Sequence, residues 1–182
     1  MEIRVEPLRA SHRPHVEKIV RAAGVFNEGE IGVALELFDS FAADSGTGAA
    51  DGGKRALDYE FIGAFDAERL VGYACFGATP STDRTYDLYW IAVHPDAQHA
   101  GAGSALMRAV ERQLVARPAR LMIVETSSRD DYAPTRRFYN KRGYEEAARL
   151  RDFYAPGDDR VVLSKRMGAV VEHSSFPHDA YE

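Results

Sequence analysis

A pair of glycines at the start of an amphipathic segment is the clearest sign of chemistry in this chain. Gln98-His99-Ala100-Gly101-Ala102-Gly103 follows the apolar run 88–93 and precedes a segment with apolar residues at helical spacing. This pattern predicts a strand, a tight turn and a helix N-terminus. The first N–H groups of a helix lack partners within it and carry partial positive charge, and glycines let a large anion approach them. We therefore expect a ligand that carries phosphate.

The spacing of the glycines indicates which kind of phosphate ligand binds. A dinucleotide fingerprint requires Gly-x-Gly-x-x-Gly, whereas this chain has Gln-x-x-Gly-x-Gly. The second pattern resembles the acyl-coenzyme A pyrophosphate loop of the GNAT superfamily of N-acetyltransferases. The resemblance implies that the coenzyme is bound by the glycine loop (residues 98–104), namely Gln98, His99, Ala100, Gly101, Ala102, Gly103 and Ser104. The alternative is a glycine-rich turn that binds nothing.

A second motif lies near the C-terminal end. Phe138-Tyr139, three further residues and Gly143-Tyr144 resemble another GNAT signature. The resemblance implies that Tyr139 protonates the departing coenzyme thiolate, since a tyrosine with a reference pKa of about 10 keeps its proton at neutral pH. The alternative is a tyrosine that only packs in the core. Many family members carry Asn at the position of Tyr132, where this chain has a side chain that either replaces the coenzyme contact or faces the acceptor.

The strand before the glycine loop has its own role in this family. The resemblance implies that Ile91, Ala92 and Val93 pair with the amide groups of the pantetheine arm. It also implies that the N–H near Val93 polarises the thioester carbonyl, as an oxyanion donor does.

The acceptor amine arrives protonated, so the chemistry requires a general base. Alignment of the glycine loops places Asp87 where some family members carry a base glutamate, and a relaying water compensates for its shorter side chain. Asp87, Tyr89 and Ile91 share one strand face by the two-residue period. Glu125 and Glu30 are the rival candidates, and any of the three acids is alternatively a solvated charge.

The resemblance implies an acceptor groove built from the first helices, their connecting loop and the last hairpin. Candidate lining residues are Phe26, Glu28, Glu30 and Tyr89. An acidic and aromatic lining fits a cationic acceptor, namely a primary amine of a small molecule, an amino-acid derivative or a peptide N-terminus. Arg129 and Arg149 equally fit a carboxylate on the acceptor.

The rest of the chain supplies the elements that must position these residues. Helical and alternating apolar patterns predict a first helix that begins at Ser11 and ends at Gly24, and a flexible loop over residues 44–54. The predicted order is β-α-α-β-β-β-α-β-α-β-β, which is the GNAT order. We expect an α/β (α+β) fold with a mixed, mostly antiparallel sheet. Residues 1–167 form a single domain in this interpretation, and residues 168–182 form a flexible tail.

Composition excludes several classes of protein. The chain has 182 residues, a net charge of −5 and one cysteine, Cys75. The acidic balance argues against nucleic-acid binding, and no apolar stretch reaches the roughly 20 residues that span a bilayer. The single cysteine argues for a reducing, cytoplasmic compartment, and no metal-ligand spacing recurs, so we expect no metal. The last hairpin and the tail leave a homodimer possible.

Together these observations predict an acyl-coenzyme A-dependent N-acyltransferase that uses acetyl-coenzyme A. The amine attacks the thioester directly, and binding both substrates together supplies rate by orientation. A non-catalytic acyl-coenzyme A sensor on the same fold is the alternative from another class, because fold does not imply function. A nucleotide binder that uses the same helix terminus is a third possibility.

Overall fold

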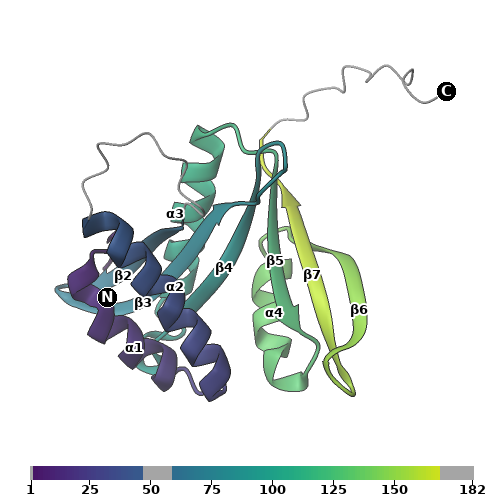
Figure 1. The fold of residues 1–182 in the computed structure, drawn as a ribbon, viewed down its shortest axis with the longest axis horizontal. Helices are drawn as coiled ribbons and strands as arrows, with labels where there is room; N and C mark the ends of the chain where they lie inside the picture. The colour runs from purple at the N-terminus through teal and green to yellow at the C-terminus, as the bar shows by residue number, and fades with distance from the viewer. Residues whose placement is uncertain (1, 47–58, 169–182) are drawn as a thin grey trace.

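The computed structural model describes residues 2–46 and 59–168. Seven strands form one sheet in the order β1-β2-β3-β4-β5-β7-β6 (Figure 1). The strands are β1 (Ile3–Pro7), β2 (Glu60–Asp66), β3 (Arg69–Ala78), β4 (Thr85–Val93), β5 (Leu121–Ser127), β6 (Glu145–Ala155) and β7 (Asp158–Arg166). All neighbours pair antiparallel except β4 and β5. The mixed, mostly antiparallel sheet expected from the sequence is confirmed.

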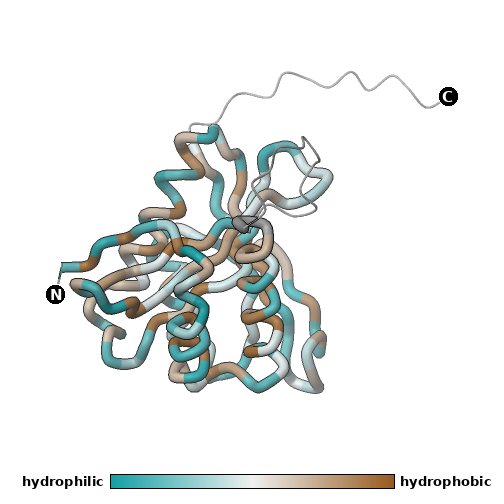
Figure 2. Tube along the Cα trace, turned by 60° about the vertical axis from the view of Figure 1, so that its left-hand side comes forward, coloured by the Kyte–Doolittle hydropathy of each residue, from teal (hydrophilic) through white to brown (hydrophobic). Residues whose placement is uncertain are grey.

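Helices cover both faces of the sheet. They are α1 (Arg13–Ala22), α2 (Glu28–Gly46), α3 (Ala102–Ala116) and α4 (Ala133–Asn140), with short 3-10 turns η1 (Ala10–His12), η2 (Pro95–Ala97) and η3 (Asp130–Tyr132). One core forms beneath α1 and α2, where Val16 and Phe38 are fully buried. The other forms around α3, where Leu106 and Val110 are fully buried. Apolar residues therefore recur between polar ones along the helices (Figure 2).

The sheet splits where the parallel pair should continue. Pairing between β4 and β5 ends at Leu88 and Val124, yet β4 continues to Val93 and β5 to Ser127. The two strands therefore diverge toward one end of the sheet (Figure 1). Beyond this point β4 and β5 no longer pair with each other, and we call their unpaired ends the split (residues 89–93 and 125–127).

A β-bulge beside the split changes which side chains share a face. Cys75 pairs with Trp90, but the next residue of β3 pairs with Leu88, so Tyr89 is the extra residue. Tyr89 and Trp90 consequently both pack on the α1–α2 side, whereas Ile91 packs on the α3 side. The prediction that Tyr89 and Ile91 share a face is therefore wrong, because the two-residue period holds only in an unbulged strand.

Two local predictions also need correction. Ser11 lies inside η1, and the residue that precedes α1 is His12, which makes no side-chain cap. Helix α2 extends to Gly46, so residues 44–46 of the expected loop are helical, and the rest of that loop, residues 47–54, lies outside the described residues. The expected tail, residues 168–182, also lies outside them except for Gly168. No helix within residues 2–46 and 59–168 is long and apolar enough to cross a membrane.

Candidate active site

The glycine loop holds its backbone in an unusual conformation. Gly101 precedes α3 with φ of 87°, and His99 has φ of 66°, so two residues of the loop are left-handed. Successive residues that alternate in this way turn their N–H groups toward a common point, which suits an anion. The first helical bond runs from the Ala105 N–H to the Gly101 carbonyl at 2.8 Å, so the N–H groups of Ala102 and Gly103 lack partners within the helix.

Strand β4 leads into this loop with two backbone N–H groups directed at the split. The His94 N–H donates to the Val71 carbonyl on β3 at 2.8 Å. Because N–H directions alternate along an antiparallel strand, the N–H groups of Val93 and Ile91 point away from β3, toward the split. The Val93 carbonyl accepts from the Gln98 side chain at 3.4 Å, which links the strand to the glycine loop.

Tyr139 lies on α4 and is 2% exposed. Its ring makes edge contacts with Phe138 and Tyr144, at centroid distances of 5.4 and 5.7 Å. Burial raises the pKa of Tyr139 above its usual range, so the phenol keeps its proton at neutral pH. Both roles considered from the sequence, an inward core side chain and a proton donor, are compatible with this environment.

Helix α4 also contacts the start of α3. A Cβ placed on Gly103 would lie 3.4 Å from the Phe138 ring, so the start of α3 and the Phe138 ring pack close together. Arg142 donates to the Ser104 hydroxyl from the end of α4. The sequence analysis did not single out Arg142, because nothing in the local pattern shows that it reaches a loop 38 residues earlier. It is the one additional charged side chain that we add to the candidate site.

The candidate bases differ in their partners. Asp87 is half-buried and accepts from the Thr79 hydroxyl at 2.6 Å. Glu125 forms an ion pair with Arg160. Glu30 accepts from the Asn27 N–H at 2.8 Å while the Asn27 side chain accepts from the Glu30 N–H at 3.0 Å. That reciprocal pair is a capping box, so Glu30 has a structural role at the start of α2.

The other predicted acceptor residues lie on the α1–α2 side. The Phe26 ring packs against Trp90 at 4.8 Å, and Tyr89 makes an edge contact with another tyrosine at 5.1 Å. Burial, together with the nearby Asp87, raises the pKa of Tyr89 to about 12. Glu28 is exposed and pairs with Arg21 of α1 at 3.0 Å. The two aromatic residues of the expected acceptor site, Phe26 and Tyr89, thus lie against or on β4, whereas Glu28 forms an ion pair with α1.

Tyr132 connects the start of α4 to the loop between α1 and α2. It is the N-cap residue of α4, and its hydroxyl donates to the Val25 carbonyl in the loop between α1 and α2, at 3.4 Å. The Arg129 guanidinium lies 5.3 Å from the centre of its ring. Burial raises the pKa of Tyr132 to about 12, and the charge of Glu30 contributes to this shift. These contacts place Tyr132 beside the first helices, the region expected to hold the acceptor.

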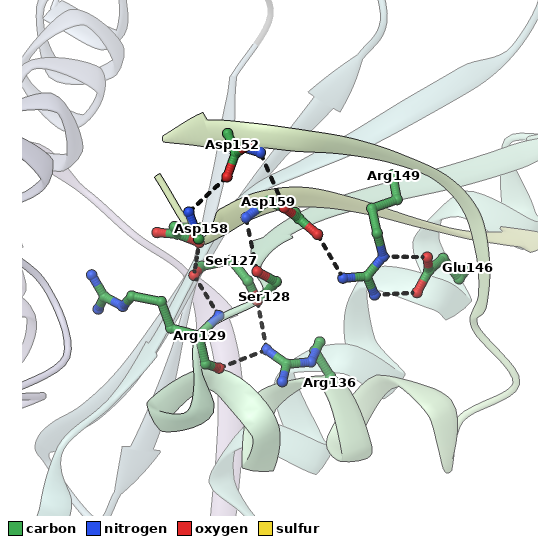
Figure 3. A network of polar contacts seen from close by, with 10 residues as sticks. Ser127, Ser128, Arg129, Arg136, Glu146, Arg149, Asp152, Asp158 and Asp159 are labelled. Atoms are coloured by element: carbon green, nitrogen blue, oxygen red, sulfur yellow. Dashed lines mark hydrogen bonds and ion pairs between the residues drawn. The ribbon is translucent and has the colours of Figure 1, made fainter. Parts of the chain in front are cut away.

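A polar network fixes the last hairpin to the end of β5 (Figure 3). The Ser127 hydroxyl donates to Asp158 at 2.5 Å, and the Asp159 N–H donates to Ser128 at 2.8 Å. Arg149 bridges Asp159 and a glutamate of β6. The charge of Arg149 is therefore already neutralised, and so is that of Arg129, which pairs with Asp131 at 2.8 Å. Neither arginine is a free carboxylate receptor in this arrangement.

The part of the chain that the structure describes holds no group of three or more side chains able to bind a metal ion. The arrangement instead combines a row of backbone N–H groups, a helix N-terminus, a buried phenol and carboxylates. Such a set can hold a long anionic ligand in the split and can move protons at its inner end.

Comparison with known proteins agrees with this geometry. The model of the Acetyltransferase (GNAT) family matches residues 36–144. No curated protein sequence matches the chain significantly. A crystal structure of a protein from Desulfovibrio desulfuricans, described as GNAT family, is 36% identical with a TM-score of 0.80. The alignment covers 92% of this chain and 100% of that one.

More distant structures share the fold. The ribosomal-protein-S18-alanine N-acetyltransferase of Escherichia coli is 20% identical, with a TM-score of 0.71, over 96% of this chain and 100% of that one. The protein yncA of Salmonella typhimurium, solved with acetyl-CoA, is 16% identical, with a TM-score of 0.67, over 95% and 96%. At these identities the likeness shows the fold alone. The family model and the 36% identical structure show that this chain belongs to the GNAT acetyltransferase family.

Proposed function

We propose that this protein is an acetyl-CoA-dependent N-acetyltransferase that acts on a primary amine. The observation that carries the proposal is the split, where the Ile91 and Val93 N–H groups lead to the N-terminus of α3. An extended arm with amide groups fits such a strand edge, and a diphosphate fits the helix terminus. A relative with the same fold, yncA, is solved with acetyl-CoA.

The reaction follows from the groups around the split. The acceptor amine loses a proton to Asp87 through a water molecule, and its nitrogen attacks the thioester carbon. The C–N bond forms, the C–S bond breaks, and Tyr139 gives its proton to the departing thiolate. The nitrogen then loses its second proton, which restores the phenol of Tyr139. The products are the acetylated amine and coenzyme A, with no covalent enzyme intermediate.

Strand geometry bears on which N–H stabilises the oxyanion. Val93 lies six residues from Asp87, which is about 20 Å along an extended strand, whereas Ile91 lies about 13 Å away. Both N–H groups have the same direction. The shorter span to the base favours Ile91 as the donor to the thioester oxygen and leaves Val93 for the pantetheine arm, which refines the expectation from the sequence.

The burial of Tyr139 favours one alternative, a protein that binds acyl-coenzyme A without catalysis. A phenol that is only 2% exposed needs a change in its surroundings, or direct contact with the bound sulfur, before it can transfer a proton. A sensor has no such requirement.

Release of free thiol from acetyl-CoA distinguishes the two functions. The assay is run with separate panels of amines, amino acids, polyamines, aminoglycosides and short peptides, and the acceptor is checked for added acetyl mass. We expect release with one acceptor class. Calorimetric binding of coenzyme A without release from any panel would contradict the transferase and support the sensor.

A further inference from the structure

A guanidinium with only neutral partners lies beside the glycine loop. Arg142 donates from Nη1 to the Phe138 carbonyl at 2.7 Å and from Nη2 to the Ser104 hydroxyl. The guanidinium carbon lies 3.6 Å from the centre of the Phe138 ring. A carbonyl, a hydroxyl and an aromatic face orient the charge but do not neutralise it. Two of the five N–H donors of the guanidinium are used, so others remain for a ligand.

Nearby acids do not supply the missing counter-charge. Within the described ranges, no carboxylate lies at ion-pair distance from Arg142. The negative charge of Glu111 favours the charged form of Arg142. Glu111, however, already accepts hydrogen bonds from Lys165 at 2.9 Å and from the Tyr144 hydroxyl at 3.1 Å. Burial lowers the pKa of Arg142, and the charge of Arg108 lowers it further. An arginine nevertheless stays protonated at neutral pH, so a partly buried cation remains without an anion.

The position of this cation identifies the anion. Ser104 ends the glycine loop and is the third residue of α3, so its N–H is one of those without a partner in the helix. An anion that accepts from these N–H groups lies within reach of the guanidinium that donates to the same residue. We propose that Arg142 binds the diphosphate of the coenzyme together with the N–H groups of the glycine loop. This inference rests on the coenzyme site of the proposed function.

The chemistry of arginine suits this role. A planar guanidinium matches two phosphate oxygens at once, and stacking on Phe138 fixes its plane before the ligand arrives. Less conformational freedom is then lost on binding, which favours affinity. Coenzyme A also carries a separate phosphate on the ribose 3′ position, which an arginine recognises equally well. The test must therefore separate binding of the diphosphate from binding of the 3′-phosphate.

Calorimetry on the full chain with three ligands makes this separation. Coenzyme A carries both phosphate groups, 3′-dephospho-coenzyme A carries only the diphosphate, and pantetheine carries neither. For Arg142→Met we expect Kd to rise about tenfold or more for the first two ligands alike, because hydrogen bonds to charged groups are the strong ones. Pantetheine binding should not change. Arg142→Lys keeps the charge but loses the planar set of N–H donors that binds two phosphate oxygens at once. Its affinity for coenzyme A should therefore lie between those of the wild type and Arg142→Met.

Arg112→Met is the matched control, since Arg112 is an exposed arginine farther along α3 and its loss changes the net charge equally. It should leave all three Kd values unchanged. An unchanged Kd for coenzyme A in Arg142→Met would overturn the inference. A loss confined to coenzyme A would assign Arg142 to the 3′-phosphate instead, and an equal loss for pantetheine would show that it only holds α4 in place. Wild-type protein that binds no coenzyme A would refute the proposed function as well.

Discussion

At the residue scale, two of the candidate bases, Asp87 and Glu125, differ in the partners that their carboxylates already have. Asp87 accepts a hydrogen bond from the neutral hydroxyl of Thr79, and its other hydrogen-bonding neighbour, the Tyr89 phenol, is also neutral. Glu125 is paired with the Arg160 guanidinium and must leave it to accept a proton from an amine. A carboxylate with a neutral partner remains the better proton acceptor, because an adjacent cation stabilises the charged form. This difference favours Asp87 as the base.

Asp87→Asn should therefore lower kcat/KM by about 100-fold at neutral pH, the lower range for loss of a general base. The deficit should shrink as the pH approaches the pKa of the acceptor amine, because the free amine no longer needs the base. Glu125→Gln should have a much smaller effect. The measurement is the pH dependence of thiol release for each variant.

Thr79→Val serves as the control, since it removes the hydrogen bond from Thr79 to Asp87 but keeps the carboxylate. It should retain most of the activity. If Glu125→Gln shows the large, pH-dependent loss and Asp87→Asn does not, the assignment of the base is reversed.

At the element scale, the junction between β4 and α3 depends on one left-handed glycine. A Cβ on Gly101 would meet nothing within 4 Å, so any cost of Gly101→Ala comes from its φ of 87°. An L-residue pays about 1–2 kcal/mol in this conformation. We expect a modest loss of stability and a several-fold rise in Kd for acetyl-CoA, because the loop N–H groups shift. Urea unfolding and calorimetry measure the two effects.

Gly157→Ala separates these effects, because Gly157 has φ of 82° and equally open space in the turn between β6 and β7. It should lose as much stability and keep its coenzyme affinity. Equal coenzyme affinities in the two variants would mean that the glycine loop does not bind the ligand.

The order of elements could be predicted because each helix and strand carries its own periodicity, and the glycine loop because its signal is local. The bulge at Tyr89 could not be predicted, since it depends on the register between β3 and β4. Ser11 resembled a helix cap, but a 3-10 turn intervenes before α1. The contacts of Arg142 with Ser104 and of Tyr132 with Val25 join residues 38 and 107 positions apart, which no local pattern encodes.

At the scale of the whole molecule, three tyrosines within residues 2–46 and 59–168 are almost completely buried. Tyr73, Tyr139 and Tyr144 are at most 2% exposed, and burial raises the pKa of each. In the unfolded chain they ionise near pH 10. Above that pH the unfolded state binds fewer protons than the folded state, so stability present below pH 10 is lost as the pH rises.

Well above pH 10 the free energy of unfolding should therefore fall by about 1.4 kcal/mol per pH unit for each tyrosine, or about 4 kcal/mol per unit for three, and between pH 9 and pH 11 by about half of that on average. Urea unfolding between pH 9 and pH 11 measures this slope. Tyr73→Phe should reduce it by about one third. A free energy of unfolding that stays constant up to pH 11 would show that these phenols are not kept neutral by the fold.

The most direct measurement is the turnover of Tyr139→Phe with acetyl-CoA and the acceptor found by thiol release. If Tyr139 protonates the departing thiolate, kcat falls at least about 100-fold while the Kd for coenzyme A stays unchanged. Tyr144→Phe, which alters a buried tyrosine in contact with Tyr139, should keep kcat near that of the wild type. Full turnover in Tyr139→Phe would contradict the proposed transfer mechanism, and Tyr139 would then be a core residue only.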